Sequence, residues 1–247
     1  MTEAGSLPRD ERALLALWER ALALDAPARE AWLANDGGTL EPAATLGEQR
    51  ARLLRALVSW CGHRLALRSR CPRCGDAVAF DVDPAALATS EAADSEELEF
   101  DEDGWQVRFR PLAPADVEAA LRAAGEGDEP AFVQRLLACS VLAARRDGVE
   151  QPPLSLPATV AERLVQRLEA ADPLASIAFE VACPQCAHAW QASFDAGSTL
   201  WVHVQSAAER LLAEIDALAR RYGWSEQQIL SLGPTRRRAY LQLAGLA

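Results

Sequence analysis

The sequence has no apolar run of about 18 residues, the length that a membrane-spanning helix needs. Its first residues, MTEAGSLPRDER, have neither the basic start nor the apolar core of a secretion signal. Basic residues are also scarce: 36 acidic residues outweigh 25 basic ones and leave a formal charge of -11. This charge opposes the attraction to phosphates on which most nucleic-acid binding depends. We therefore expect a cytoplasmic protein with no membrane partner, and a nucleic-acid partner is disfavoured.

The usual signatures of catalysis are missing as well. No Ser-His-Asp arrangement and no glycine-rich phosphate loop can be recognised. The three histidines, His63, His188 and His203, stand outside any known motif. The sequence therefore predicts a protein that is not an enzyme and has no small-molecule substrate.

What the sequence does contain is a repeated cysteine motif. CPRC, at Cys71 to Cys74, returns as CPQC, at Cys183 to Cys186, and only two other cysteines occur. In a reducing compartment such pairs hold a metal or carry out redox chemistry. A thioredoxin-like pair would begin a helix, but a proline follows each first cysteine and alternating residues flank both pairs. The alternation at 64–70, 76–82, 176–182 and 189–194 instead predicts that each pair lies at the tip of a β-hairpin.

Two such hairpin tips supply the four ligands that Zn²⁺ takes in a structural site. The sequence therefore predicts one structural Zn²⁺ per chain, bound by Cys71, Cys74, Cys183 and Cys186. The alternatives are two unconnected pairs in loops and a two-cysteine redox switch. His188 could replace one ligand, although four cysteines already suffice. Cys61 and Cys139 lie on apolar helical faces and are expected in the core.

Around this site the chain is expected to be mainly helical. Apolar residues recur with helical spacing in six segments, at residues 11–24, 47–60, 114–124, 129–146, 158–171 and 199–222. A short helix begins at Asp83-Pro84, and Glu102-Asp103-Gly104 predicts a further hairpin, for about six short strands. The predicted fold is α+β: mainly helical, with a small antiparallel β part built around a split four-cysteine zinc ribbon. Metal loss should therefore unfold at least the β part.

Five segments follow from this pattern. They are N-terminal helices (1–62), a first zinc knuckle with a β-hairpin (63–113), middle helices (114–173), a second knuckle that completes the ribbon (174–197), and a long helix with a C-terminal helical hairpin (198–247). In the last segment Gly223 ends one helix, Ser225 and Gln228 form a capping box, and Gly233-Pro234 starts another helix.

Two charge runs stand out. Residues 91–103 carry eight acidic residues and no basic one. We interpret them as a solvated loop and strand with Arg108 and Arg110 across from it, because the spacing does not match a calcium-binding loop. The opposite run, Arg236 to Arg238, is a plain helix surface or a contact with an acidic partner.

Trp, Tyr and Arg dominate the energetics of protein interfaces. The sequence accordingly offers a candidate partner surface in its last segment, made of Trp201, Trp224, Arg236, Arg237, Arg238 and Tyr240. Packing of both tryptophans into the core is the competing interpretation.

Several motifs resemble one known family. They are WERALAL at residues 18–24, the CPxC pairs with their Phe-Asp endings, WQVRFRP at 105–111, YGWSEQQIL at 222–230 and RRRAYL at 236–241. Together they resemble the baseplate hub assembly proteins, or assembly chaperones, of T-even-like contractile phages and their relatives in phage-derived contractile injection systems. The resemblance covers nearly the whole chain. It implies a non-enzymatic role in building or forming the baseplate hub, with hub or spike proteins as partners, and leaves open whether the chain stays in the finished particle.

Two other classes of protein remain open. A zinc-ribbon module that binds nucleic acid, or a general protein-interaction module, could use Arg64, Arg68, Arg70 and Arg73 as a local basic face, although interleaved aromatic residues are missing. A metalloenzyme would need a water in place of one zinc ligand, and four cysteines leave no such position.

Overall fold

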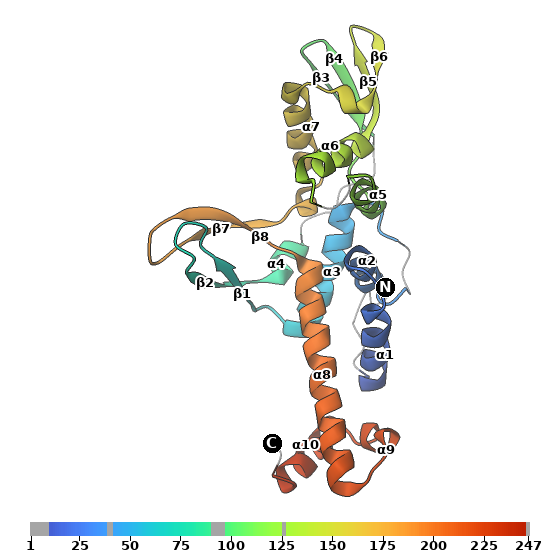
Figure 1. Cartoon of the computed structure of the whole chain (residues 1–247), viewed down its shortest axis with the longest axis vertical. Coiled ribbons are helices and arrows are strands. Elements are labelled where there is room, and N and C mark those ends of the chain that lie inside the picture. The colour runs from blue at the N-terminus through green and yellow to red at the C-terminus, as the bar shows by residue number, and fades with distance from the viewer. Residues whose placement is uncertain (1–9, 39–41, 90–96, 125–126, 246–247) are drawn as a thin grey trace.

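The computed structural model describes residues 10–38, 42–89, 97–124 and 127–245 of the 247-residue chain. The molecule is elongated (Figure 1), with a four-stranded sheet at one end and two short C-terminal helices at the other. Two β-hairpins project together from its middle as a side arm, next to the start of a long helix. Within the described ranges, no helix is long and apolar enough to cross a membrane.

The described residues form ten α-helices and two short 3-10 helices. The α-helices are α1 (Glu11–Leu22), α2 (Ala26–Ala34), α3 (Leu46–Cys61), α4 (Pro84–Ala88), α5 (Pro114–Ala124), α6 (Glu129–Ser140), α7 (Ala158–Ala171), α8 (Ala196–Tyr222), α9 (Glu226–Leu230) and α10 (Pro234–Leu243). The 3-10 helices are η1 (Pro153–Ser155) and η2 (Pro173–Ala175).

The strands form three antiparallel sheets. Strands β1 (Leu65–Arg70) and β2 (Ala77–Val82) pair with each other, as do β7 (Ala178–Ala182) and β8 (Ala189–Ser193). Strands β3 (Leu98–Glu102), β4 (Trp105–Phe109), β5 (Val141–Arg146) and β6 (Val149–Gln151) form a four-stranded sheet in chain order. The predicted α+β class, mainly helical with a small antiparallel part, is confirmed. However, only the two hairpins surround the cysteines, and the larger sheet lies apart from them.

Local chemistry explains where the helices begin and end. Side-chain oxygens of Thr45, Asp83 and Asp195 accept the first backbone N–H groups of α3, α4 and α8, and so satisfy donors that a helix leaves free. Gly223 ends α8 in the left-handed conformation, with φ of 69°. The capping box of Ser225 and Gln228 starts α9 as predicted.

The helix predicted over residues 129–146 is partly wrong, because α6 ends at Ser140 and the chain continues as β5. Asp147 and Gly148 have φ of 49° and 83°, the positive values of a tight hairpin turn, and they join β5 to β6. Strand β5 also pairs with β4, so both of its edges are satisfied. The Asp-Gly pair is therefore the turn of a hairpin that the sequence analysis did not predict. Helix α2, capped by Asp25, was not predicted.

Three apolar cores run along the molecule. The central one joins α1, α2, α3 and the first half of α8, with Leu53, Leu54, Leu57, Leu200 and Val204 at its centre. A second packs α7 against the four-stranded sheet. A third packs α9 and α10 against the last turns of α8. The side arm has its own small core, described next.

Candidate metal centre

The two cysteine pairs lie at the tips of the two hairpins of the side arm, as predicted. Each tip has the same hydrogen bonds: Cys71 N donates to Asp76 O and Gly75 N to Cys71 O, all at 2.9 Å. In the second tip, Cys183 N donates to His188 O and Ala187 N to Cys183 O, again at 2.9 Å. These bonds turn both side chains of a pair, and the backbone N–H groups between them, toward one point. Each tip can therefore offer two thiolates to one metal ion, as the knuckles predicted from the sequence would.

The residue after each second cysteine has a left-handed backbone. Gly75 has φ of 77°, and Ala187 has φ of 54°. Glycine adopts this conformation freely, whereas for alanine it is less stable by roughly 1–2 kcal/mol. The two knuckles thus have one backbone shape despite different sequences, and the second holds it against local strain.

The structure brings the four sulfur atoms together although 108 residues separate the two pairs. The Sγ atoms of Cys71 and Cys186 are 3.6 Å apart, and those of Cys74 and Cys183 are also 3.6 Å apart. All four lie within 4.8 Å of one another. A tetrahedral ion with metal–sulfur bonds of about 2.3 Å would place the sulfurs about 3.8 Å apart. The cluster therefore has the size of a four-thiolate metal site.

The four thiols differ in exposure. Cys71 and Cys183 are each 2% exposed, Cys186 is half-buried and Cys74 is exposed at the rim. Burial raises the pKa of Cys71. The backbone N–H groups of Cys74 and Arg73 and the neighbouring thiols together outweigh this effect, so the pKa of Cys71 falls to about 7. The N–H of Asp76 lowers the pKa of Cys74, but the thiols of Cys186, Cys183 and Cys71, with burial, raise it to about 12.

These opposite shifts have one cause. Thiols in contact can hydrogen-bond to a single thiolate, but four adjacent negative charges repel one another. A bound divalent cation removes that restriction, because its charge stabilises each thiolate. The site is thus suited to a metal ion.

A small apolar core connects the hairpins below the cysteines. Val78 of β2 packs with Val181 and Ala192 of the second hairpin. The ring of Phe80 meets that of Phe179 edge-on at 5.9 Å, and Phe179 lies 5.8 Å from Phe194. Phe194 belongs to the central core and immediately precedes the cap of α8. The cysteine site is therefore connected through aromatic contacts to the start of the long helix.

The other candidate ligands stay outside the cluster. Among the described residues, only the four cysteines form a group of His, Cys, Asp or Glu side chains placed to hold a metal. His188 is part of the second knuckle's backbone, and its ring stacks with Trp190 at 6.3 Å. Cys61 and Cys139 are half-buried, and burial raises the pKa of both thiols.

The residues predicted to bind a partner fall into two places. Trp201 lies near the start of α8, half-buried, with the guanidinium of Arg29 4.7 Å from its ring. Trp224 and Tyr240 lie at the far end of the molecule, where both contact the ring of Tyr222. The long helix predicted over residues 199–222, which is α8, lies between them, so the predicted residues do not form one continuous surface.

The three consecutive arginines also separate. Arg236 and Arg238 are exposed, but Arg237 is buried. The Arg237 guanidinium forms ion pairs with Glu11 and Glu214 and donates to Leu232 O. Arg237 is therefore not a surface contact, contrary to its place in the predicted partner surface. Its partners on α1 and α8 could not be found from local sequence, because they are 226 and 23 residues away.

The acidic run 91–103 lies partly outside the described residues, which resume at Glu97. Glu97 forms an ion pair with Arg108, and Glu102 with Arg163. Arg110, by contrast, does not face β3, because both of its terminal nitrogens contact Asp116 of α5, at 2.7 and 2.8 Å. The expected neighbour Arg108 is thus confirmed, and Arg110 is corrected.

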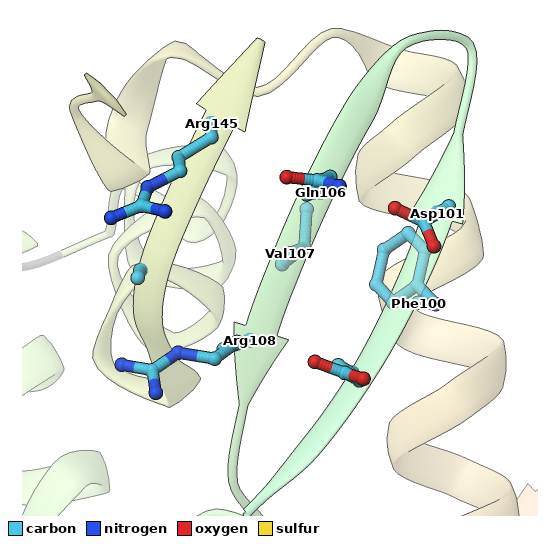
Figure 2. Close-up of a pocket in the computed structure, with 8 residues that line it drawn as sticks. Phe100, Asp101, Gln106, Val107, Arg108 and Arg145 are labelled. Atoms are coloured by element: carbon cyan, nitrogen blue, oxygen red, sulfur yellow. The ribbon is translucent and has the colours of Figure 1, made fainter. Parts of the chain in front are cut away.

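A concavity of about 330 Å³ lies on the open face of the four-stranded sheet. Figure 2 shows Asp101, Gln106, Arg108 and Arg145 on this face, along three neighbouring strands. The lining carries charges of both signs but no thiol, hydroxyl or histidine. The cysteine cluster is therefore the better candidate for a functional site.

Comparison with family models, with curated proteins and with solved structures finds no match for this chain. The family resemblance carried by its motifs accordingly stays a prediction.

Proposed function

We propose that the cysteine cluster holds one structural Zn²⁺ per chain. Four thiolates complete a tetrahedral shell, which leaves no position for a water or a substrate. The 3.6 Å sulfur–sulfur distances carry this proposal, since they fit such an ion without movement of the hairpins. Two of the four thiols are nearly inaccessible, which suits a structural ion better than a redox pair.

Elemental analysis of freshly purified protein tests the metal. We expect about one zinc per chain, and loss of that zinc in the Cys71→Ser variant but not in Cys61→Ser. Iron is the other common metal that four thiolates bind. Stoichiometric iron, or no metal at all, would contradict the proposal.

We further propose that the chain is a non-enzymatic assembly factor or structural component of the baseplate hub of a contractile phage tail or injection system. The motif resemblance supports the hub assignment. The closed coordination shell and the extended array of three cores support a protein that acts by binding other proteins. On this proposal the chain is made in the cytoplasm and binds hub or spike proteins there. Free thiols in two pairs fit that reducing compartment.

The C-terminal helices are our candidate for the partner surface. Arg236 and Arg238 are exposed on α10, and the Leu243 side chain nearby is 77% exposed. Trp224 and Tyr240 are partly buried against each other, with ring centroids 4.9 Å apart. They therefore support the surface from below, and the arginines and the leucine are the groups that a partner could contact directly.

Deleting residues 223–247 would be a poor test, because it would uncover the buried side chains of Ile215 and Leu218 on α8. A better test changes only exposed groups: Arg236→Glu, Arg238→Glu and Leu243→Asp together. The matched control carries Arg122→Glu, Arg135→Glu and Leu121→Asp, which are exposed at the other end of the molecule.

Both variants are produced in cells that make the contractile particle, in place of the natural chain. We expect the C-terminal variant to lose co-purification with hub components and to abolish intact particles in electron micrographs, whereas the control supports both. Normal particles from the C-terminal variant would show that the C-terminal helices are not the partner surface. Normal particles in cells without the chain would overturn the assembly role itself.

A further inference from the structure

We propose that the outer face of the β1–β2 hairpin, formed by Arg68 and Arg70 on β1 with Arg73 at the hairpin tip, binds an acidic polypeptide segment. This inference does not depend on the hub assignment. It goes beyond the metal site, which positions the hairpin but uses none of these side chains as ligands.

The first observation is an unbalanced charge. All lysine and arginine positions of this acidic chain are arginines, and some of them have acidic partners, such as Arg64 with Asp81 at 2.7 Å and Arg110 with Asp116. Arg68 and Arg73 form no side-chain hydrogen bond or ion pair within the described parts of the chain. Arg70 donates only to Gly75 O of its own knuckle, at 3.3 Å. All three side chains are exposed.

The second observation is the shape of this face. Leu65 and Leu67 of β1 point toward the central core, so Arg68 and Arg70 lie on the opposite, exposed side of the strand. Their partners across the hairpin are Ala79 and Ala77, which offer no carboxylate. Residues two apart on a strand are about 7 Å apart. The face therefore carries two arginines at alternate strand positions, next to small side chains on the partner strand.

The chemistry of this face favours carboxylates on a polypeptide over a nucleic acid. A guanidinium pairs with a carboxylate through two parallel hydrogen bonds. An extended peptide with acidic residues at alternate positions would match the spacing of Arg68 and Arg70. Binding to single-stranded nucleic acid needs exposed aromatic rings among the basic groups. The arm's aromatic rings instead contact one another, Phe80 with Phe179 and Trp190 with His188, and the formal charge of -11 repels a long polyanion.

The test uses the full metal-loaded chain and a fluorescein-labelled Glu-Ser repeat peptide, with binding followed by anisotropy. The test variant is Arg68→Glu, Arg70→Glu, Arg73→Glu. The matched control is Arg122→Glu, Arg135→Glu, Arg167→Glu, at exposed positions of α5, α6 and α7, away from the side arm. Both triples change the net charge equally, so any difference between them is local. A neutral triple, Arg68→Gln, Arg70→Gln, Arg73→Gln, guards against new carboxylates that disturb the metal site. Metal content is measured for each.

We expect the wild-type chain to bind the Glu-Ser peptide, and to bind it more weakly as salt rises. The first triple and its neutral form should weaken binding by about tenfold or more, and the control by less than about twofold. No binding by the wild-type chain, or equal losses in both Glu triples, would overturn the proposal. So would tighter binding of an oligothymidine of equal length that is lost in the first triple, because the face would then belong to nucleic acid.

Discussion

The side chain of Arg237 is only 3% exposed, although it is the middle of three consecutive arginines. A helix places neighbouring residues about 100° apart, so when the middle residue of such a run faces the protein, the two beside it lie on the flanks of the helix and stay exposed. Here α10 packs across α8 and the start of α1, and Arg237 is the residue that faces both helices. Its guanidinium is satisfied by two carboxylates and one carbonyl. Because the neighbouring acids raise its already high pKa, Arg237 keeps its charge at any ordinary pH.

Arg237→Ala should therefore destabilise the protein by about 2 to 3 kcal/mol, because it leaves Glu11 and Glu214 without their cation. We place the loss at or below the lower limit of the roughly 3 to 5 kcal/mol that breaking a buried pair costs, since both glutamates keep some contact with water. Arg236→Ala, at an exposed position next to it, should change stability by less than about 0.5 kcal/mol. Urea unfolding curves of the two variants measure the difference. Equal midpoints would show that the buried ion pairs do not stabilise the C-terminal helices.

At the scale of elements, the four-stranded sheet and α7 form one lobe, which we call the sheet lobe. Its main contact with the central helices lies at the start of α3. Asp172, which follows α7 and is 2% exposed, accepts a hydrogen bond from Gly47 N at 2.9 Å. Arg50 of α3 donates to Ala175 O of η2 at 2.7 Å. The first turn of α3 thus holds the segment that leads from α7 into β7. Asp172 is an anion near a helix N-terminus, where backbone N–H groups attract negative charge.

The close approach at this contact requires glycine. A Cβ on Gly47 would lie 1.7 Å from Asp172 Oδ1. We expect Gly47→Ala to lower the free energy of unfolding by about 1 to 2 kcal/mol, because the overlap outweighs the roughly 1 kcal/mol by which alanine favours a helix. At Gly233, the N-cap of α10, a Cβ would meet nothing within 4 Å, so Gly233→Ala is the control and should cost only about 0.5 kcal/mol, from the poorer cap alone. Denaturant unfolding distinguishes the two. A neutral Gly47→Ala would mean that Asp172 can move aside freely.

The same contact predicts a pH dependence. Burial raises the pKa of Asp172, although Gly47 N, the Thr45 hydroxyl and the charge of Arg50 oppose the rise. The unfolded carboxyl therefore loses its proton at lower pH than the folded one. Between those two pKa values the folded state binds more protons, so this group's contribution to stability falls as pH rises.

Asp172→Asn keeps an oxygen for Gly47 N but cannot ionise. Its stability relative to wild type should therefore increase as pH rises from the ordinary carboxyl pKa through the raised one, and then level off. Thermal unfolding of both proteins across mildly acidic to neutral pH measures this. A stability difference that is constant with pH would contradict the prediction.

At the scale of the whole molecule, the cysteine cluster joins the β1–β2 and β7–β8 hairpins, whose tips lie outside the three large apolar cores. The side arm has few apolar contacts of its own, and two-stranded hairpins are marginal in isolation. The sheet lobe and the C-terminal helices each have a separate core. Metal loss should therefore act on the arm first and then on the start of α8, through Phe179 and Phe194.

Treatment with a chelator should strongly raise hydrogen exchange in β1, β2, β7, β8 and the first turns of α8. The core strand β4 and helix α7 should keep their protection, because their apolar contacts do not involve the arm. Cys71→Ser should reproduce this pattern and Cys61→Ser should not. Uniform loss of protection along the chain would indicate that the metal supports all three cores at once. No change in the arm would refute the structural role of the site.

The sequence by itself determined the features that depend on neighbours along the chain. Alternating residues around each CPxC motif predicted the two hairpins, because side chains alternate between the faces of a strand. Helical spacing, with capping residues such as Ser225 and Gln228, predicted most helices. The four ligands followed from chemistry alone, because each hairpin offers two thiolates and a tetrahedral ion needs four.

Only the tertiary structure decided the features that depend on distant segments. Residues 141–146 could continue a helix, and they form a strand because β4 and β6 lie on either side. Arg237 could face water, and it is buried because Glu11 and Glu214 approach it from two other helices. In the local sequence Gly47 is only a residue that weakens a helix, and the need for glycine there comes from the close approach of Asp172. In each case the local preference differs by about 1 kcal/mol or less between the alternatives, and packing contributes more than that.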